Sequence, residues 1–535
     1  MVGRIIRFFY FEKNEKNNKR NNQTRLRNQS SIKQVKKILF MSETGTSILN
    51  NTKTMFVAQI ITWTSSFFLM MFLPRYLGAD AYGRLYFAIS LTMLGGLIID
   101  LGFSNYFVKE VARDRTKVNL FFMNGIGLRI VAWLTAMAIM FLYVYITGFT
   151  SELLSLLLIL GFQKLLETIS DLAHRIFQSF ERLRYRSIAV IIERVSLSAI
   201  AVTMLLLGYG IITIALVMAF STFLNFLTCL YFIPRLVTIK MQITISSWMK
   251  LIGGSLPFLI STFFSFVYYR IDVIMLSALT NNSVVGWYGA PYRLFDTMMF
   301  FPSILQIVVF PVFARLWKQS RNDFILNARR SLDASIIIGF LIAFCLIALA
   351  RPIVDLLFGL EHYLNSVILL QLLAVTLPLV YANFILGTVD TSSDKQKELS
   401  IVSIIATFIN IGLNFWLIPL FQESSGNGAI GAAIATLITE ICVLIMFGYL
   451  LPRGCFGKEN LLVIAKSLIA GIISGIFLWY IESKFKMWLV SGIISVFVYT
   501  VLLAATNVLT KRELNIALSL FPKRWKDTAS RLSGL

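Results

Sequence analysis

The sequence predicts an all-α integral membrane protein with about 14 transmembrane helices, in two parallel six-helix lobes followed by two extra C-terminal helices. Three observations predict this fold class. The 535 residues are 57% apolar and only 14% charged, whereas soluble domains contain about 25% charged residues. The apolar residues gather into long runs, and the basic residues between the runs alternate between crowded and sparse loops. A soluble globular protein of this length is excluded.

Fourteen apolar runs account for most of the chain after residue 53. A helix of about 20 apolar residues crosses roughly 30 Å of hydrocarbon, so each run is long enough to be one span. The runs lie at 54–73, 85–107, 120–146, 152–172, 187–207, 211–233, 251–277, 291–313, 331–350, 364–389, 399–420, 429–451, 463–481 and 487–509.

The charges of the loops predict the orientation of the spans. If the N-terminus is cytoplasmic, the even-numbered loops carry 20 Lys and Arg residues and the odd-numbered loops carry 5. Cytoplasmic loops of membrane proteins hold an excess of basic residues. We therefore expect a multi-pass protein of the cell membrane with both termini in the cytoplasm.

Two pairs of similar segments indicate an internal duplication. LGADAYGRLYFA (Leu77–Ala88) resembles LTNNSVVGWYGA (Leu279–Ala290), which aligns Gly83 with Gly286. A second pair, GYGIITIALVMAF and GNGAIGAAIATLI, precedes the sixth and the twelfth runs. Six spans per repeat is an even number, so both repeats cross the membrane in the same direction and are related by an axis along the membrane normal.

The two ends of the chain are basic: 12 of the 49 Lys and Arg residues precede residue 54, and 6 follow residue 510. Met41 opens a segment that leads directly into the first run and is a second candidate start. The expected divisions are a disordered cytoplasmic extension at 1–46, an N-terminal lobe at 47–235, a C-terminal lobe at 236–452, two further helices at 453–510 and a cytoplasmic tail at 511–535.

The sequence offers few residues for nucleic-acid binding, metal binding or histidine-based catalysis. The net charge of +22 is spread over loops and tails, which is typical of membrane orientation and not of nucleic-acid binding. The four cysteines show no metal-binding spacing, and the two histidines are far apart. We expect no metal, no cofactor and no nucleic-acid partner.

Ionisable residues inside the predicted spans are the candidate functional residues. Each costs about 2.5–3.5 kcal/mol at the centre of a bilayer, so such residues face a bundle interior or a hydrated cavity. The candidate substrate-binding cations are Arg129, Lys164, Arg270 and Arg293. The candidate coupling or structural acids are Asp100, Glu167, Asp272, Asp296 and Glu440.

Helical spacing predicts some of their partners. Lys164 and Glu167 begin an i, i+3, i+7, i+11 stripe that lies on one helix face, and this face either lines a cavity or pairs with a neighbouring helix. Arg293 and Asp296 are spaced i, i+3, so Asp296 either neutralises Arg293 or leaves it free. Arg270 and Asp272, two residues apart, point to different faces and each need another partner.

Four motifs carry a resemblance to a known family. RYLGADAYG from Arg75, DLGFSNYFVKEVARD from Asp100, RIDVIML…VGWYGAPYRLFD from Arg270 and GAIGAAIATLITE from Gly428 resemble the polysaccharide transporter family. This family includes the O-antigen flippases and belongs to the multidrug/oligosaccharidyl-lipid/polysaccharide exporter superfamily. The resemblance covers about residues 47–510.

The resemblance implies a V-shaped exporter whose central cavity opens alternately to each side. It implies a flippase that moves an isoprenoid-diphosphate-linked oligosaccharide to the outer leaflet, with no enzymatic activity of its own. Its expected partners are the lipid-linked saccharide, membrane lipids and the glycosyltransferases or polymerase of the same pathway. The sequence leaves four driving forces for transport open: H⁺, Na⁺, the membrane potential or the substrate gradient alone. The alternatives are a multidrug/cation antiporter of the same superfamily and a membrane enzyme that acts on the same lipid.

Overall fold

The computed structural model describes residues 21–100, 102–148, 150–180, 182–240, 243–485 and 487–508, and these residues form helices and no strands. The first half contains α2 (Asn21–Asp100), α3 (Phe103–Arg113), η1 (Arg115–Lys117), α4 (Val118–Thr147), α5 (Ser151–Ser179), α6 (Leu183–Leu206), α7 (Ile211–Phe232) and η2 (Ile233–Arg235). The second half contains α8 (Ile245–Leu279), α9 (Asn282–Met298), α10 (Phe300–Gln319), α11 (Arg321–Ala348), α12 (Ala350–Leu357), α13 (Leu360–Tyr363), α14 (Ser366–Ser392), α15 (Gln396–Ser425), α16 (Gly428–Leu450), α17 (Lys458–Phe485) and α18 (Trp488–Ala505).

The helices agree with the predicted series of spans. Among the described residues, 11 stretches are long and apolar enough to cross a membrane, and Val490–Ala505 is a shorter apolar helix. One of the stretches, Ala58–Asp100, has 43 residues and contains most of the first two apolar runs. The run at 251–277 lies on α8, which has 35 residues. The prediction of an all-α membrane protein is confirmed.

Helix α2 changes direction at Gly78, whose φ of 74° and ψ of 168° interrupt the helical path. This φ lies in a region that glycine adopts without steric cost, which is why the turn between the first two spans can be a single residue. Helix α2 begins at Asn21, so it extends into the basic segment that was expected to be disordered at 1–46. A helix nucleated by an apolar span extends at little further cost. Residues 1–20 and 509–535 lie outside the described residues.

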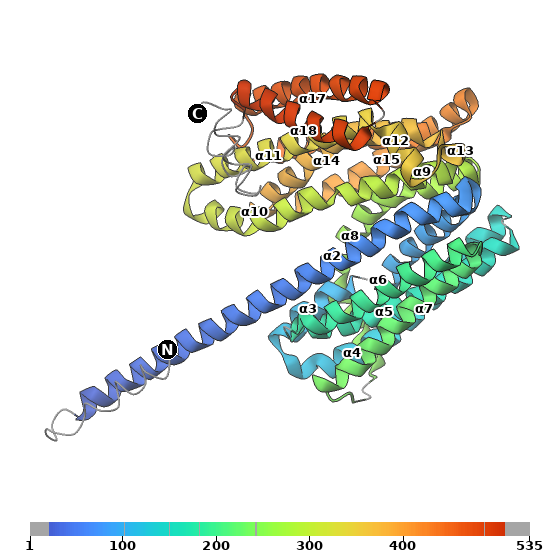
Figure 1. Ribbon diagram of the computed structural model, residues 1–535. Helices are drawn as coiled ribbons and strands as arrows, with labels where there is room; N and C mark the ends of the chain where they lie inside the picture. The colour runs from blue at the N-terminus through green and yellow to red at the C-terminus, as the bar shows by residue number, and fades with distance from the viewer. Residues whose placement is uncertain are drawn as a thin grey trace.

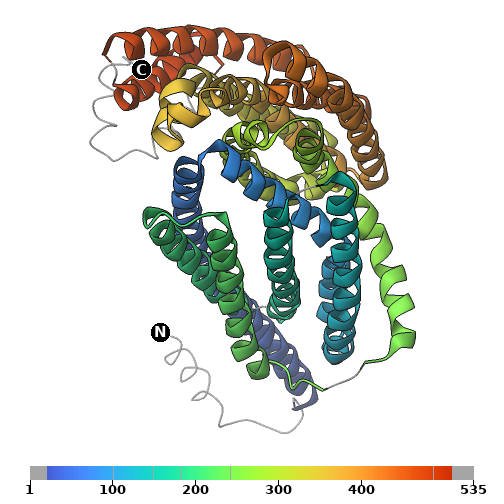
Figure 2. The ribbon, with the colours of Figure 1, turned by 90° about the vertical axis from the view of Figure 1, so that its right-hand side faces the viewer.

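The helices form two groups. In the first, α2 packs with α4, α5 and α6, while α7 packs with α5 and α6; we call this group the N-terminal lobe. In the second, α14 packs with α9, α10, α11 and α16, and α15 packs with α16; this is the C-terminal lobe. Helices α17 and α18 pack on each other and on α11, along the outer side of the C-terminal lobe (Figure 1). A view from the side shows the blue, teal and green helices of the first lobe below the yellow-green, yellow, orange and red helices of the second (Figure 2).

Helix α8 connects the lobes and contacts both. Its first turns pack on α3 and α4, where Trp248 Nε1 donates a hydrogen bond to Asn124 Oδ1 at 2.9 Å. Its later turns pack on α15, where Thr407 Oγ1 donates to the carbonyl oxygen of Phe264 at 3.1 Å. One helix therefore forms part of the wall on both sides of the space between the lobes.

The duplicated motif forms a reciprocal contact between the lobes. A Cβ atom at Gly83 would overlap the carbonyl oxygen of Asn282 and lie 2.9 Å from the amide nitrogen of Gly286. A Cβ atom at Gly286 would overlap the carbonyl oxygen of Ala79 and lie 2.8 Å from its carbonyl carbon. Gly83 thus faces Asn282, four residues before Gly286, and Gly286 faces Ala79, four residues before Gly83. This reciprocal pattern is that of two helices related by a two-fold axis. We call this end of the bundle the Gly83 end, and the opposite end, with the loops before α6 and between α16 and α17, the Arg182 end.

Candidate functional site

A cavity of about 580 Å³ lies between the lobes. The described residues that line it come mostly from α2, α5, α6 and α7, with smaller contributions from α3, α4, α8 and α9. Seven of them are cations: Arg129, Lys164, Arg175, Arg186, Arg194, Arg270 and Arg293. Five are carboxylates: Asp100, Glu167, Asp171, Glu193 and Asp296. The cavity lining therefore has an excess of two positive charges.

Arg129 of α4 joins three elements at the wall of the cavity. Its side chain is 2% exposed. Its guanidinium pairs with Asp100 at the end of α2 and donates to the carbonyl oxygen of Thr168 in α5. A further contact of 3.5 Å reaches Asp171 Oδ2, and Ser104 Oγ accepts from Arg129 Nη2 at 2.8 Å. Because its charge is neutralised and buried, Arg129 holds α2, α4 and α5 together as well as bordering the cavity.

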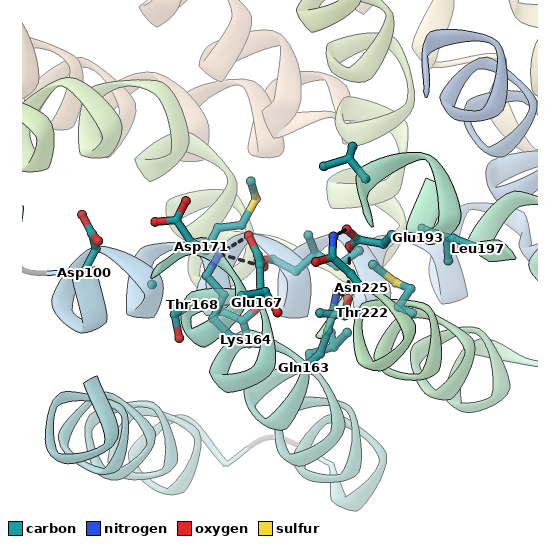
Figure 3. Close-up of a pocket in the computed structure, with 18 of the residues that line it drawn as sticks. Asp100, Gln163, Lys164, Glu167, Thr168, Asp171, Glu193, Leu197, Thr222 and Asn225 are labelled. Carbon is teal, nitrogen blue, oxygen red and sulfur yellow. Dashed lines mark hydrogen bonds and ion pairs between the residues drawn. The ribbon is translucent and has the colours of Figure 1, made fainter. Parts of the chain in front are cut away.

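The predicted stripe on α5 lines the cavity. Lys164 Nζ lies 3.1 Å from Glu167 Oε1, and Arg175 Nη2 lies 3.1 Å from Asp171 Oδ1. All four side chains border the cavity, so the stripe both lines it and pairs within its own helix. Figure 3 shows Lys164 and Glu167 pointing toward each other across one turn.

Beside this stripe, α6 and α7 contribute a polar cluster whose hydrogen-bond donors are all uncharged. Glu193 Oε2 accepts a hydrogen bond from Asn225 Nδ2 at 2.7 Å, and Thr222 Oγ1 donates to Glu193 Oε1 at 3.3 Å. Gln163 Nε2 donates to Thr222 Oγ1 at 3.2 Å. In Figure 3 these side chains lie next to one another on three neighbouring helices. They offer hydroxyl and amide groups of the kind that bind hydroxylated ligands.

The part of the cavity nearest the Gly83 end has a different set of charges. Asp296 Oδ2 accepts from Arg270 Nη2 at 2.8 Å, and Arg270 Nη1 donates to the Tyr86 hydroxyl at 3.1 Å. The ion pair of Asp296 is therefore with Arg270 of α8, which packs beside α9, and not with Arg293 on its own helix. Arg293 lines the cavity and belongs to no ion pair among the described side chains.

Two of the candidate acids lie away from this cavity. Asp272 is 2% exposed and accepts hydrogen bonds from the Tyr288 hydroxyl and from the amide of Val273. These donors are the partners other than Arg270 that its spacing from Arg270 predicted. Glu440 is 3% exposed inside the C-terminal lobe. It accepts hydrogen bonds from the Tyr268 hydroxyl and, at 2.6 Å, from Asn383 Nδ2.

Sequence reasoning missed part of the site. Arg186 was counted only as a charge of the loop between the fourth and fifth spans, but α6 begins at Leu183, so Arg186 lies on a helix that lines the cavity. The signal for Arg186 was its eight-residue spacing from Arg194, which places both on one face of α6. Asn225 carries no charge and stood out by no pattern.

The described residues contain no group of three or more His, Cys, Asp or Glu side chains that could hold a metal ion. Cys455, in the loop between α16 and α17, is buried, and burial raises the pKa of its thiol to about 11. It is therefore a neutral thiol at physiological pH and not a reactive or metal-binding thiolate.

Comparison with known sequences identifies the family. Residues 48–317 match the family model described as polysaccharide biosynthesis protein. A relative, the capsular polysaccharide biosynthesis protein CapF of Staphylococcus aureus, is 23% identical over 411 residues, which cover 76% of this chain and 100% of CapF.

Comparison with solved structures identifies the fold. The lipid II flippase MurJ in an inward closed conformation superposes with a TM-score of 0.70 at 15% identity, covering 86% of this chain and 98% of MurJ. An inward-facing multidrug resistance MATE family transporter of the MOP superfamily superposes with a TM-score of 0.61 at 12% identity, covering 73% of this chain and 97% of the transporter. This chain is therefore a multi-pass membrane protein that belongs to the polysaccharide biosynthesis protein family and has the fold of the MOP superfamily exporters.

Proposed function

We propose that this protein is a flippase that moves an isoprenoid-diphosphate-linked oligosaccharide from the cytoplasmic to the outer leaflet of the cell membrane for surface polysaccharide synthesis. The cavity between the lobes receives the diphosphate and the saccharide, while the isoprenoid chain stays in the lipid. The Arg182 end faces the cytoplasm in this proposal, as the distribution of basic loops predicts. Both termini are then cytoplasmic, and the cavity opens to each side in turn.

The observation that carries the proposal is a group of cavity arginines without an ion-pair partner. Arg186, Arg194 and Arg293 line the cavity but form no ion pair with another described side chain. Arg186 and Arg194 are two turns apart on α6, about 12 Å along the helix axis, and Arg293 lies on α9 toward the Gly83 end. The unpaired cations thus mark a path along the cavity, toward the proposed outer side.

An unpaired arginine suits this cargo for a physical reason. Moving an ionised phosphate from water into hydrocarbon costs on the order of tens of kcal/mol when no compensating charge is present. A guanidinium stays protonated at any physiological pH and binds phosphate through two parallel hydrogen bonds. Cations that are already neutralised, such as Arg129 and Arg270, must first break an ion pair before they can bind phosphate.

The test is transport by the purified protein in proteoliposomes that contain a fluorescent isoprenoid-diphosphate oligosaccharide. Arrival in the far leaflet is measured as protection from a membrane-impermeant reagent. We expect Arg186→Ala/Arg194→Ala to raise the apparent KM for the lipid-linked saccharide. The increase should be about 10- to 150-fold for each hydrogen bond to phosphate that is removed, since a charge-assisted hydrogen bond contributes about 1.5–3 kcal/mol.

The matched control is Arg184→Ala/Lys240→Ala. It removes the same charge from exposed positions near the Arg182 end that do not line the cavity. Equal transport by the cavity variant and the control variant would contradict the proposed phosphate path.

A multidrug/cation antiporter is the second candidate function, because the fold is shared with MATE transporters. That similarity concerns the fold alone, and the cavity's excess of cations opposes a cationic drug. Gradient-driven efflux of a cationic dye by these proteoliposomes, with no movement of the lipid-linked saccharide, would support the antiporter and overturn the flippase.

We also propose Glu440 as the residue that couples transport to H⁺ or Na⁺. Asp100, Glu167 and Asp296 are each neutralised by a cation within the described structure. Asp272 and Glu440 instead accept hydrogen bonds only from uncharged donors, and Glu440 differs from Asp272 in the further acceptor that lies beside it. A buried carboxylate inside a membrane is stable when it is protonated or binds a cation, so its occupancy responds to the ion gradient. Asn383 Oδ1, which has no hydrogen-bond partner, supplies a further acceptor beside it.

A further inference from the structure

A second cavity lies in the C-terminal lobe, separate from the cavity between the lobes. Its volume is about 350 Å³, and the described residues that line it, from α11, α14, α16, α17 and the loop before α17, are apolar or glycine. Its floor contains Ala382 and Leu386 of α14, which are 5% and 4% exposed. Its rim contains Ile445 of α16 and Phe456 of the loop, which are 54% and 44% exposed. We call this open hollow the α16–α17 groove.

The loop between α16 and α17 borders the groove at the Arg182 end and is held firmly in place. Arg329 Nε donates to the carbonyl oxygen of Gly454 at 2.7 Å, and Arg329 Nη1 lies 3.1 Å from Glu459 Oε2. Lys395 Nζ donates to the carbonyl oxygen of Leu450. Arg329 thus fixes the loop on both sides of Phe456, at Gly454 and Glu459, and Lys395 binds the last carbonyl group of α16.

Two other cations of the same loop region are not engaged in ion pairs with described residues. Arg453 and Lys458 are exposed and belong to no ion pair in the part of the chain that the structure describes. They flank Phe456 in sequence, three residues before it and two residues after it. Two exposed cations therefore lie within three residues, along the chain, of Phe456 at the rim of an apolar hollow.

We propose that the α16–α17 groove binds an anionic membrane phospholipid, with an acyl chain lying between α16 and α17 and the phosphate on Arg453 and Lys458. Basic side chains at the membrane surface attract anionic lipid headgroups, and the groove removes the apolar chain from contact with water or mobile lipid. A water-soluble ligand would find no hydrogen-bond partner among the described lining side chains. The bound lipid fills the space between the six-helix lobe and α17, and so becomes part of the structure of this lobe.

The test is lipid binding to the purified full-length protein, with phosphatidylglycerol as the probe and phosphatidylcholine as the neutral comparison. Native mass spectrometry counts the lipids retained, and titration gives the apparent affinity. We expect Arg453→Ala/Lys458→Ala to weaken phosphatidylglycerol binding at least about tenfold, since each surface cation is worth about fivefold. Binding of phosphatidylcholine should change less than twofold.

A second variant tests the groove itself. Gly448 lines the groove, and a Cβ atom there would have no neighbour within 4 Å, so Gly448→Trp introduces a large ring beside the hollow from a position with free space. We expect this variant to lose one retained phosphatidylglycerol. Gly412→Trp is the matched control, because Gly412 is also an exposed glycine of a helix with open space around its Cβ position but does not line the groove.

Three outcomes would overturn the proposal. One is unchanged phosphatidylglycerol binding by both groove variants, and another is the same loss in the Gly412→Trp control. The third is retention of undecaprenyl phosphate in place of phosphatidylglycerol, lost in Gly448→Trp, which would make the groove a site for the isoprenoid chain of the cargo. Variants of Arg186 and Arg194 leave the groove intact, so failure of the proposed transport function would not produce any of these results.

Discussion

The reciprocal contact of Gly83 and Gly286 predicts a strong conformational effect of a single methyl group. In Gly83→Ala, the new Cβ atom would overlap the carbonyl oxygen of Asn282 and lie 2.9 Å from the amide nitrogen of Gly286. Both neighbours are backbone atoms within α9, so neither can rotate away as a side chain would. The lobes must separate at the Gly83 end, or the helices must distort.

The magnitude follows from the cost of overpacking. One extra methyl group in a tightly packed contact costs about 1–3 kcal/mol, which corresponds to about 5- to 150-fold in the ratio of two conformations. Gly83→Ala should therefore shift the population away from the state in which the lobes touch at the Gly83 end. Because the contact is reciprocal, Gly286→Ala should produce the same shift through the carbonyl group of Ala79.

The assay is a distance distribution between spin labels on Thr147 and Glu423, which are exposed residues of different lobes near the Gly83 end. Both glycine variants should lengthen the distance and reduce the transport rate in proteoliposomes. Gly210→Ala is the control, because Gly210 has a φ of −84° and no atom within 4 Å of its Cβ position. An unchanged distance distribution in a folded Gly83→Ala protein would refute the argument.

Three further changes have expected outcomes. Arg129→Ala should destabilise the protein by about 2–3 kcal/mol, less than the 3–5 kcal/mol of a fully buried pair, because its two carboxylate partners are 31% and 30% exposed; a lowered melting temperature in detergent checks this, and an unchanged one would show that the pairs contribute nothing. Glu440→Gln keeps an acceptor and removes the charge, so saccharide movement should no longer respond to an imposed H⁺ or Na⁺ gradient; a wild-type response would exclude Glu440 as the coupling residue. Gly471→Leu should lower the melting temperature, because a Cβ atom there would overlap the ring of Phe344; a melting temperature equal to that of the native protein would mean that α17 shifts freely on α11.

The sequence alone determined the features that depend on local pattern. Length and polarity of the apolar runs predict spans, because hydrocarbon leaves the backbone no partner other than its own helix. The alignment of Gly83 with Gly286 predicted the repeat, and the structure brings these two residues into contact. Pairing within one helix, as for Lys164 and Glu167, follows from a spacing of three residues and was also predictable.

Only the tertiary structure decided which helices supply the two partners of an ion pair. Asp296 pairs with Arg270 on α8 and not with Arg293 on its own helix, because the packing of α8 on α9 sets the distance. Arg186 became a cavity residue because α6 begins before it and turns it toward α5. The α16–α17 groove has no sequence signature, since its apolar lining comes from four helices that are separated along the chain. Periodicity specifies the faces of a helix, but the partner of each face depends on how the whole set of helices packs, and no local pattern encodes that arrangement.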